Sequence, residues 1–337
     1  MPHVQWKERY NINYKDIDAQ HQGLIVLLND LMDLLERQRE AEEVSTIFHR
    51  LFEYTQVHFA TEERYMKKAR YVGLLAHKAA HAAFMRRLLE LNDAYDPTDP
   101  KLLEATLDFL REWYVNHIMR MDMEYVPHMQ GLLGKLPVRG VLFDFGNVLS
   151  AFDTRRFTAR LAETCGADPA ALHAAIYERS GLIPQYESGA LDSSAFARRL
   201  AALCEHPFTD DALAEAYADI FTPTPAVQDL VRRLKPKYRL GLISETGPWH
   251  LERAIRTCPV FPLFDAATFS CEVGHLKPSA QLFEDALGKL DLISEECVYI
   301  DDREEVVAAA RALRFHGIVF RSAEALEVEL RRLGLEV

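Results

Sequence analysis

The sequence has few of the features that mark a secreted, disulfide-stabilised or membrane protein. The five cysteines are Cys165, Cys204, Cys258, Cys271 and Cys297. They are widely spaced and include no CxxC pair, which argues against a disulfide framework or a zinc ribbon, so we expect reduced thiols in packed positions. No run reaches the roughly 18 apolar residues of a membrane helix, and the opening stretch MPHVQWKERY has charges where a secretory signal needs apolar residues. We therefore expect a cytoplasmic protein.

An excess of basic charge is also missing. The chain has 39 Lys and Arg against 51 Asp and Glu, and a formal net charge of −12. Nucleic acids and anionic membrane surfaces both need concentrated Lys and Arg, so neither is expected as a main partner. Small molecules and proteins remain. A length of 337 residues exceeds the usual size of one hydrophobic core and indicates two or three domains.

Residues 18–132 have the periodicity of a helical bundle. Apolar residues recur at three- and four-residue spacing in HQGLIVLLNDLMDLLERQ and in VSTIFHRLFEYTQVHFATEERYMKKA. Turn chemistry interrupts the pattern near Arg70–Gly73 and in DAYDPTDP. Four helical segments result, which fits an antiparallel four-helix bundle ending near Gly134. We predict a first domain over 1–134.

The pattern changes after Pro137. Short apolar strands occur at VRGVLFDFG, RLGLIS and CVYIDD, with helical stretches between them. This alternation predicts an α/β domain with a parallel sheet and right-handed crossovers. The helical span from about 152 to 235 lies between the first two strands and is expected to be an inserted cap. We predict a second domain over 135–337, with its core formed by 138–151 and 236–337.

One group of residues in the predicted bundle has the chemistry of metal ligands: His21, His58, Glu62, His77, His81, His117 and Asp122. Residues four apart on a helix, such as His77 and His81, project from one face. Alone, that pair also fits a polar surface. Imidazole and carboxylate groups inside a bundle are costly unless paired or ligated, so five histidines and two carboxylates from four helices predict a site for two metal ions.

The motifs around these residues resemble the bacterial hemerythrin family. They are a Trp and a Tyr at positions 6 and 10, D-x-Q-H ending at His21, H-F-x-x-E-E starting at His58, H-x-x-x-H starting at His77, and H-I-x-x-x-D-x-x-Y starting at His117. The resemblance implies that His77, His81 and His117 bind one iron, that His21 and His58 bind the other, and that Glu62 and Asp122 bridge them. It also implies that dioxygen binds at the second iron. The imidazole-rich ligand set favours binding or sensing over substrate oxidation.

A second group of residues lies at the ends of the predicted strands. VLFDFGNVL ends a strand at Asp144, GLISE places Ser244 at the end of another, GHLKPS supplies Lys277, and VYIDD supplies Asp301 and Asp302. Ligand sites of parallel sheets lie at these strand ends. In their order and spacing, the four segments resemble the motifs of the haloacid dehalogenase (HAD) superfamily over roughly residues 138–330.

The resemblance implies a phosphoryl-transfer site. Asp144 is the expected nucleophile and forms an aspartyl-phosphate. Mg²⁺ would be held by Asp144, the backbone carbonyl of Gly146, Asp301 and Asp302, the last through water. Ser244 would bind a transferring phosphoryl oxygen, and Lys277 would place a positive charge beside it.

Several positions depart from the usual HAD pattern or point to the substrate. Gly146 stands where most HAD phosphatases have an Asp that protonates the leaving group, a form shared by a subset resembling sugar-phosphate phosphatases. Glu245 stands where Asn often follows the motif Ser, and we expect Glu245 or a water to replace the acid. Tyr186 and Glu187 in the cap stretch QYESGALDSSAF, together with Asn147 and Glu245, are the expected substrate contacts. For Tyr186 and Glu187, a solvated helix junction fits equally well.

The sequence thus predicts an enzyme, a Mg²⁺-dependent phosphatase acting on a small phosphorylated metabolite and responsive to oxygen or redox state through a di-iron domain. Two alternatives remain. The first is 2-haloacid dehalogenation by the same nucleophile, which is disfavoured because that branch needs no metal. The second is a degenerate HAD domain that acts as a binding or signalling module, suggested by Gly146.

Overall fold

The computed structural model describes residues 4–337 except 13, 37–40, 95–99, 130–135 and 205–208. The chain divides into two compact units, Met1–Leu136 and Pro137–Val337, and each has its own hydrophobic core. The division lies two residues beyond the boundary predicted at 134. Among the described residues, no helix is both long and apolar enough to span a membrane.

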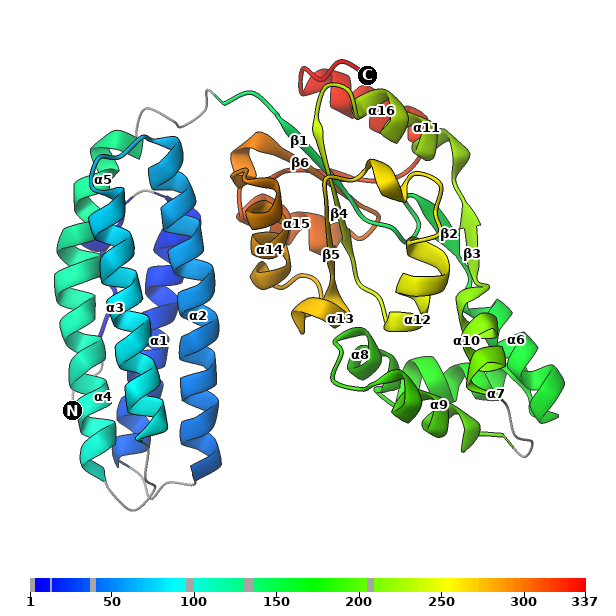
Figure 1. Cartoon of the computed structure of the whole chain (residues 1–337), viewed down its shortest axis with the longest axis horizontal. Helices are drawn as coiled ribbons and strands as arrows, with labels where there is room; N and C mark the ends of the chain where they lie inside the picture. The colour runs from blue at the N-terminus through cyan, green and yellow to red at the C-terminus, as the bar shows by residue number, and fades with distance from the viewer. Residues whose placement is uncertain (1–3, 13, 37–40, 95–99, 130–135, 205–208) are drawn as a thin grey trace. The chain divides into compact units, whose positions relative to one another are not determined.

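The first unit is a bundle of four long helical segments (Figure 1). They are α1 (Lys15–Glu36), α2 (Ala41–Lys68), α3 (Leu74–Asp93) and a fourth segment formed by α4 (Pro100–Trp113), η2 (Tyr114–Met121) and α5 (Asp122–Met129). α1 packs against α2 and α4, and α3 packs against α2 and α4. The predicted all-helical bundle is confirmed.

The bundle core follows from helical periodicity. Leu24, Leu28 and Leu31 of α1 are three or four residues apart and fully buried. They belong to one apolar cluster with Phe48 of α2 and Leu88 of α3. Burying one such side chain stabilises the fold by about 1.5–3 kcal/mol. The apolar cluster therefore stabilises the bundle, and the polar candidate ligands are buried in the same bundle.

The second unit is built on a five-stranded parallel sheet in the order β5-β4-β1-β6-β7. The strands are β1 (Gly140–Phe143), β4 (Arg239–Ser244), β5 (Ala266–Phe269), β6 (Cys297–Asp301) and β7 (His316–Val319). β1, β4 and β6 are the strands predicted from the sequence, and they are adjacent at the centre of the sheet. β5 and β7, of four residues each, were not singled out because short apolar runs carry little periodicity.

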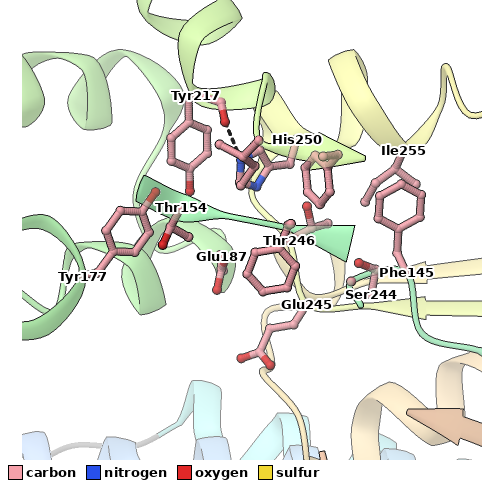
Figure 2. A pocket seen from close by; sticks show the side chains of 14 residues that line it. Phe145, Thr154, Tyr177, Glu187, Tyr217, Ser244, Glu245, Thr246, His250 and Ile255 are labelled. Carbon is pink, nitrogen blue, oxygen red and sulfur yellow. Dashed lines mark hydrogen bonds between the residues drawn. The ribbon is translucent and has the colours of Figure 1, made fainter. Parts of the chain in front are cut away.

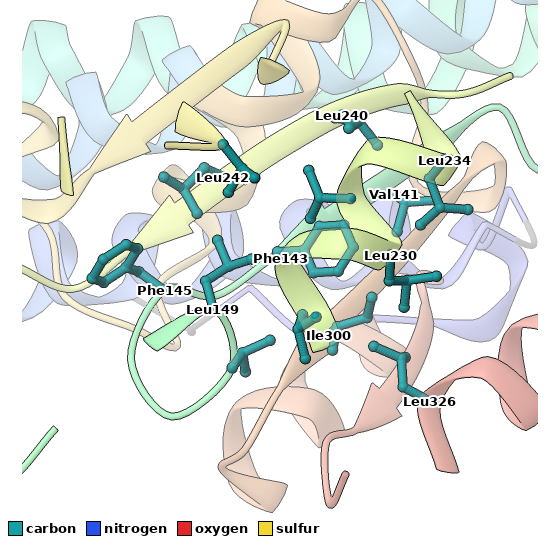
Figure 3. Packing of buried hydrophobic residues seen from close by; sticks show 14 of the residues in the cluster. Val141, Phe143, Phe145, Leu149, Leu230, Leu234, Leu240, Leu242, Ile300 and Leu326 are labelled. Carbon is teal, nitrogen blue, oxygen red and sulfur yellow. The ribbon is translucent and has the colours of Figure 1, made fainter. Parts of the chain in front are cut away.

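Helices cover both faces of this sheet because its strands are buried on both sides. Val141 and Phe143 of β1 point to one face and join a cluster with α11 (Pro225–Leu234) and α16 (Ala323–Arg332), shown in Figure 3. Leu142 points to the opposite face, toward α14 (Ala280–Leu290) and α15 (Glu304–Ala312). The alternation of side chains along β1 thus accounts for the two helical layers.

The helical cap is inserted through a two-stranded antiparallel ribbon, β2 (Ser150–Phe152) and β3 (Phe221–Pro223). Its helices are α6 (Thr154–Cys165), α7 (Pro169–His173), η3 (Ala174–Arg179), α8 (Leu182–Glu187), α9 (Ser193–Ala201) and α10 (Asp210–Ala218). The cap was predicted to extend to about 235. That end is wrong, because α11 follows the ribbon and packs with the sheet.

Short helical segments complete the two units: η1 (Glu8–Tyr10), α12 (Pro248–His250), η4 (Leu251–Ile255), η5 (Phe261–Leu263), α13 (Ser270–Val273) and η6 (Ser294–Glu296). Cys258, Cys271 and Cys297 are reduced thiols, as expected. Cys204 is disulfide-bonded. The expectation that all five cysteines are reduced is therefore wrong for Cys204, whose loop position in the cap has no sequence signal for pairing.

Candidate functional site

The bundle brings all seven predicted ligand residues together in its interior. None is more than 3% exposed. They form two groups of four, and within each group the possible ligand atoms lie within 4.8 Å of one another. One group is Glu62, His77, His81 and His117, and the other is His21, His58, Glu62 and Asp122. Glu62 belongs to both groups, so the two candidate metal positions are adjacent.

The two carboxylates face both groups of histidines. Asp122 directs Oδ1 to His117 Nε2 at 3.2 Å and to His77 Nε2 at 3.3 Å. Its other oxygen, Oδ2, lies 3.3 Å from His21 Nε2. Glu62 is arranged in the same way, with Oε2 at 3.1 Å from His81 Nε2 and Oε1 at 3.7 Å from His21 Nε2. Each carboxylate can therefore connect two cations.

The backbone of the fourth segment aligns His117 with Asp122. Residues Tyr114–Met121 are π-helical, and the Asp122 N–H donates to the carbonyl of His117, five residues earlier. A π-helical turn pairs residues i and i+5, whereas an α-helix pairs i and i+4, and such turns occur often at functional sites. The predicted inward direction of both side chains has this local cause.

Neighbouring side chains orient the ligand imidazoles. His81 Nδ1 lies 3.0 Å from Glu63 Oε1, and His58 Nδ1 lies 3.1 Å from Gln20 Oε1. A hydrogen bond at Nδ1 leaves Nε2 as the ligand atom, which is the usual outer arrangement around a metal. The Tyr125 hydroxyl donates to Glu62 Oε1 at 2.5 Å.

Several polar atoms at the centre are buried without a hydrogen-bond partner among the described residues. They are Nε2 of His21, Nε2 of His58 and both carboxylate oxygens of Asp122. Such atoms are costly unless something satisfies them. Imidazole nitrogens and carboxylate oxygens in this number are the donor set that suits iron. The residues present therefore fit two iron ions.

Charge in the centre is balanced between carboxylates and imidazoles. Burial disfavours the charged form of Glu62, but His58, His21 and His77 around it hold its pKa well below the usual range. Burial likewise disfavours charge on His21, but Asp122 and Glu62 outweigh it and raise the pKa of His21 to about 9. Two buried carboxylates thus keep their negative charge, which attracts cations into the bundle.

The second unit gathers its predicted residues at the carboxyl ends of β1 and β6. Asp144, Asp301 and Asp302 can place one carboxylate oxygen each within 4.8 Å of the others. Lys277 Nζ donates to Asp144 Oδ1 at 2.6 Å and to Asp301 Oδ2 at 2.8 Å. The arrangement is an oxygen cluster of the kind that Mg²⁺ prefers, with an ammonium group beside it.

The two buried carboxylates of this cluster differ electrostatically. Burial raises the pKa of Asp144 to about 6, although the Lys277 ammonium acts in the opposite direction. For Asp301, burial is outweighed by Lys277 and by hydrogen bonds from Tyr299 and from the Arg303 backbone, which lower its pKa. Asp144 is therefore the more basic carboxylate of the two.

Asn147 contributes to the site by holding Asp302. It adopts the left-handed conformation, with φ of 54°, and its Nδ2 donates to Asp302 Oδ2 at 2.9 Å. Glu245, predicted with it as a substrate contact, accepts a hydrogen bond from the Arg303 guanidinium at 2.7 Å. Both residues thus lie beside the carboxylate cluster and have partners of their own.

A pocket lies between the cap and the sheet (Figure 2). Its lining includes Gly146, Ser244 and Glu245 from the core, together with Tyr177, Glu187 and Tyr217 from the cap. The cavity volume is about 70 Å³. Because one water needs about 10–15 Å³ on this measure, the cavity has room for about five water molecules.

Tyr186, the other cap residue predicted to contact substrate, does not line this pocket. It is fully buried in the cap core and stacks on Phe196 at 3.9 Å between ring centroids. Its hydroxyl lies 3.0 Å from Ser193 Oγ and accepts from the Trp249 backbone N–H. Tyr186 therefore anchors the cap to the core, because its ring and its hydroxyl both have partners.

Two family models match the chain. Residues 13–129 match the hemerythrin HHE cation binding domain, and residues 138–314 match the haloacid dehalogenase-like hydrolases. The second match covers more than half of the 337 residues. The chain belongs to both families. It is a fusion of a hemerythrin domain with a HAD hydrolase domain.

Individual relatives agree with this division. Myohemerythrin of Riftia pachyptila is 30% identical over 124 residues, which are 37% of the fusion protein and 91% of the relative. D-ribitol-5-phosphate phosphatase of Bacteroides thetaiotaomicron is 23% identical over 185 residues, which are 53% of the fusion protein and 89% of the relative.

Solved structures resemble the HAD domain. A predicted HAD-like family hydrolase from Porphyromonas gingivalis has a TM-score of 0.51 and 26% identity, over 59% of the fusion protein and 99% of its own chain. A HAD family enzyme from Bacteroides thetaiotaomicron, solved with magnesium and inorganic phosphate, has a TM-score of 0.50 and 19% identity, over 55% and 95% of the two chains. The second shows the fold alone.

Some residues of the two sites were missed from the sequence. In the hemerythrin domain, Gln20 and Glu63 orient ligand imidazoles. Both lie inside the motifs D-x-Q-H and H-F-x-x-E-E, so the signal was present without a role attached to it. In the HAD domain, Tyr177 and Tyr217 line the pocket, and no local motif marks them.

Proposed function

We propose that the HAD domain is a Mg²⁺-dependent phosphatase that hydrolyses a small phosphorylated metabolite through an aspartyl-phosphate. The observation that carries this proposal is the Asp144 carboxylate, held at 2.6 Å from Lys277 Nζ within the oxygen cluster that includes Asp301 and Asp302. A relative that is a phosphatase and a neighbour of the same fold solved with magnesium and inorganic phosphate support it.

The roles of the residues follow from their chemistry. Asp144 attacks phosphorus through a carboxylate oxygen, and Ser244 donates a hydrogen bond to a phosphoryl oxygen. Lys277 offsets the repulsion between the Asp144 carboxylate and an anionic phosphate. Asp144, the Gly146 carbonyl, Asp301 and Asp302 would hold Mg²⁺, which when bound supplies charge neutralisation at the phosphate. Asn147 keeps Asp302 in position.

The pocket supports a hydroxylated leaving group. The hydroxyls of Tyr177 and Tyr217 are buried and have no hydrogen-bond partner among the described residues. Both residues line the cavity that also reaches Ser244. A substrate with hydroxyl groups would satisfy them, and the cavity volume of about 70 Å³ favours a small molecule. We therefore propose a phosphate ester of a small polyhydroxy alcohol as the substrate class.

Dehalogenation is the second candidate for the same nucleophile. Dehalogenation does not explain why Asn147 orients the Asp302 carboxylate toward the oxygen cluster. A signalling module without activity gives no account of the buried Lys277 bridging two carboxylates. Both remain outcomes of the experiment below.

We further propose that the hemerythrin domain binds two iron ions and dioxygen and that its state regulates the phosphatase. His77, His81 and His117 would hold one iron, His21 and His58 the other, and Glu62 and Asp122 both. When bound, the iron pair supplies reversible dioxygen binding and redox change. The ligand Asp122 and the nucleophile Asp144 are only 22 positions apart. A short covalent connection of this kind allows a change at one site to affect the other.

The test is hydrolysis of a panel of phosphate esters and of a 2-haloacid by the purified fusion protein, with and without Mg²⁺. We expect release of phosphate from esters, loss of activity in EDTA, and loss of turnover in Asp144→Asn. Halide release without metal would indicate a dehalogenase. No turnover of either substrate class would leave the binding module as the remaining function.

A further inference from the structure

The phosphatase site lacks a proton donor at its usual position. Gly146, two residues after the nucleophile Asp144, has no side chain. The alkoxide of an alkyl phosphate is a poor leaving group unless its oxygen receives a proton as the bond to phosphorus breaks. Another acidic group that faces the same cavity is therefore needed.

We propose that Glu187 is the general acid of this reaction and supplies from the cap the proton that Gly146 cannot, an inference that rests on the proposed function. Glu187 lines the pocket together with Gly146 and Ser244. Figure 2 shows the Glu187 side chain reaching into the pocket toward the region of Glu245. Its carboxyl group makes no hydrogen bond or ion pair with any of the described residues, so it is available to a ligand.

The backbone around Glu187 is fixed to the core. Ser270 Oγ donates to the Glu187 carbonyl at 2.6 Å. Gly189, with φ of 74°, approaches so closely that a Cβ there would lie 2.4 Å from the Cys271 carbonyl oxygen. Tyr186 is hydrogen-bonded to the Trp249 backbone N–H. These anchors on both sides of Glu187 keep its side chain at the pocket, as a proton donor requires.

The surroundings of Glu187 favour its protonated form. Burial and the neighbouring Glu245 carboxylate raise the pKa of Glu187 to about 8, against the opposing Arg303 guanidinium. The other ionisable groups near it are the hydroxyls of Tyr177 and Tyr217 and the Cys271 thiol, each with a pKa raised above its ordinary value. Near neutral pH, Glu187 therefore holds a proton that it can donate.

The other candidates in the pocket are occupied or too weakly acidic. Burial raises the pKa of the Tyr177 and Tyr217 hydroxyls, so these hydroxyls hold their protons too tightly to donate them. Glu245, an expected substitute acid, accepts a hydrogen bond from Arg303 at 2.7 Å and is engaged in an ion pair. His250 donates from Nε2 to the Tyr217 carbonyl at 2.9 Å, and burial lowers its pKa to about 4. It therefore has no spare proton at neutral pH. Glu187 is left as the donor.

The proton balance of the reaction closes with this assignment. In the first step an Asp144 oxygen bonds to phosphorus, the bond from phosphorus to the alkoxy oxygen breaks, and that oxygen takes the Glu187 proton to leave as an alcohol. In the second step water attacks the aspartyl-phosphate and gives a proton to the Glu187 carboxylate. The bond from phosphorus to the Asp144 oxygen then breaks, releasing phosphate and restoring both carboxyl groups.

The test compares Glu187→Gln with the matched control Glu163→Gln, an exposed glutamate on cap helix α6. The substrates are p-nitrophenyl phosphate, whose leaving group needs no proton, and alkyl phosphates. We expect Glu187→Gln to lower kcat for alkyl phosphates by about 10²–10⁴-fold. For p-nitrophenyl phosphate we expect a far smaller loss in the pre-steady-state burst of p-nitrophenol, which reports the first step alone, and for the control no loss on either substrate. Wild-type activity on alkyl phosphates should fall as the pH rises through about 8, and this fall should be absent in Glu187→Gln.

Two further variants separate an acid from a structural residue. Glu187→Asp keeps a carboxyl group and should keep the alkaline fall in rate. Gly146→Asp added to Glu187→Gln should restore part of the alkyl phosphate activity. A Cβ at Gly146 would meet the Phe152 ring at 3.0 Å and Asp144 Oδ2 at an ordinary contact distance of 3.8 Å, and the Phe152 side chain is exposed and able to shift. Equal losses in the first step on both substrate types, or no loss, would overturn the role of Glu187 alone. A wild type inactive on every ester would overturn the proposed function and this inference with it.

Discussion

His117 and Asp122 point toward the same candidate metal position although Asp122 comes five positions after His117, because the helix that carries them has a π-helical turn between the two. The Asp122 N–H donates to the His117 carbonyl, and Asp122 Oδ1 lies 3.2 Å from His117 Nε2. One backbone feature therefore places a candidate ligand of one metal position beside a carboxylate that faces both candidate positions. Of these two residues, Asp122 alone faces both groups of histidines.

This difference predicts unequal iron contents in two variants. His81→Ala removes a ligand of one group and should leave about one iron per chain. Asp122→Ala removes a group that faces both positions and should weaken the binding of both ions. The measurement is iron per protein by elemental analysis after loading with ferrous iron, together with the optical spectrum in air. Two tightly bound ions in Asp122→Ala would contradict the bridging arrangement, as would zinc in place of iron in the wild type.

Glu63 is expected to tune iron affinity without binding iron itself. Glu63→Gln weakens the hydrogen-bond acceptor at His81 Nδ1, and loss of such partners typically costs about 10–100-fold in metal affinity. Competition with a ferrous chelator under anaerobic conditions measures the change. Glu43→Gln, an exposed position on the same helix, is the control. Equal affinities in both variants would show that His81 needs no orienting partner.

Lys277 should be needed for stability when Mg²⁺ is absent. Lys277→Met leaves Asp144 and Asp301 buried without the cation between them, and removing one partner of a buried ion pair costs about 3–5 kcal/mol. Added Mg²⁺ should recover much of this loss, because the same carboxylates bind it. Thermal unfolding of wild type and variant over a Mg²⁺ titration provides the test. A variant whose Tm responds to Mg²⁺ no more than that of the wild type would speak against a shared cation site.

Oxygen is expected to change the phosphatase rate. We expect kcat or KM to differ by about 5-fold or more between reduced protein kept anaerobic, the same protein exposed to air, and oxidised protein, since coupling free energies are typically 1–3 kcal/mol. The assay uses one phosphate ester at fixed Mg²⁺. Asp122→Ala, with its iron site disrupted, should show no such difference. Identical kinetics in all three states would mean that the fusion only joins two independent activities.

Much of both sites could be predicted from the sequence because their residues carry local patterns. His77 and His81 are about one helical turn apart, Asp144 directly follows an apolar strand, and Asp301 ends another. Such local patterns can be recognised in a sequence before the fold is known. The end of the cap could not be predicted from such a pattern. The periodicity of α11 is the same whether the helix covers a sheet or belongs to a cap.

The substrate pocket could not be predicted for a related reason. Tyr177 and Tyr217 lie 40 residues apart and meet only through the packing of the cap helices, whereas Tyr186 has a recognisable motif and is buried elsewhere. Whether Glu187 is protonated depends on its burial and on Glu245, which the chain brings close from 58 residues away. Neither the burial of Glu187 nor its proximity to Glu245 can be recognised from the residues next to it in the sequence.

The ribbon of β2 and β3 gives the cap the properties of a detachable module. Ser150 pairs with Pro223 and Phe152 with Phe221, so the chain leaves and re-enters the core at neighbouring points. Residues 153–220 form an excursion whose two ends meet, and the sheet order does not depend on what lies between them. A foreign cap with adjacent termini could therefore be grafted at this ribbon, exchanging the acid and the leaving-group contacts while the nucleophile and the cation cluster stay in place.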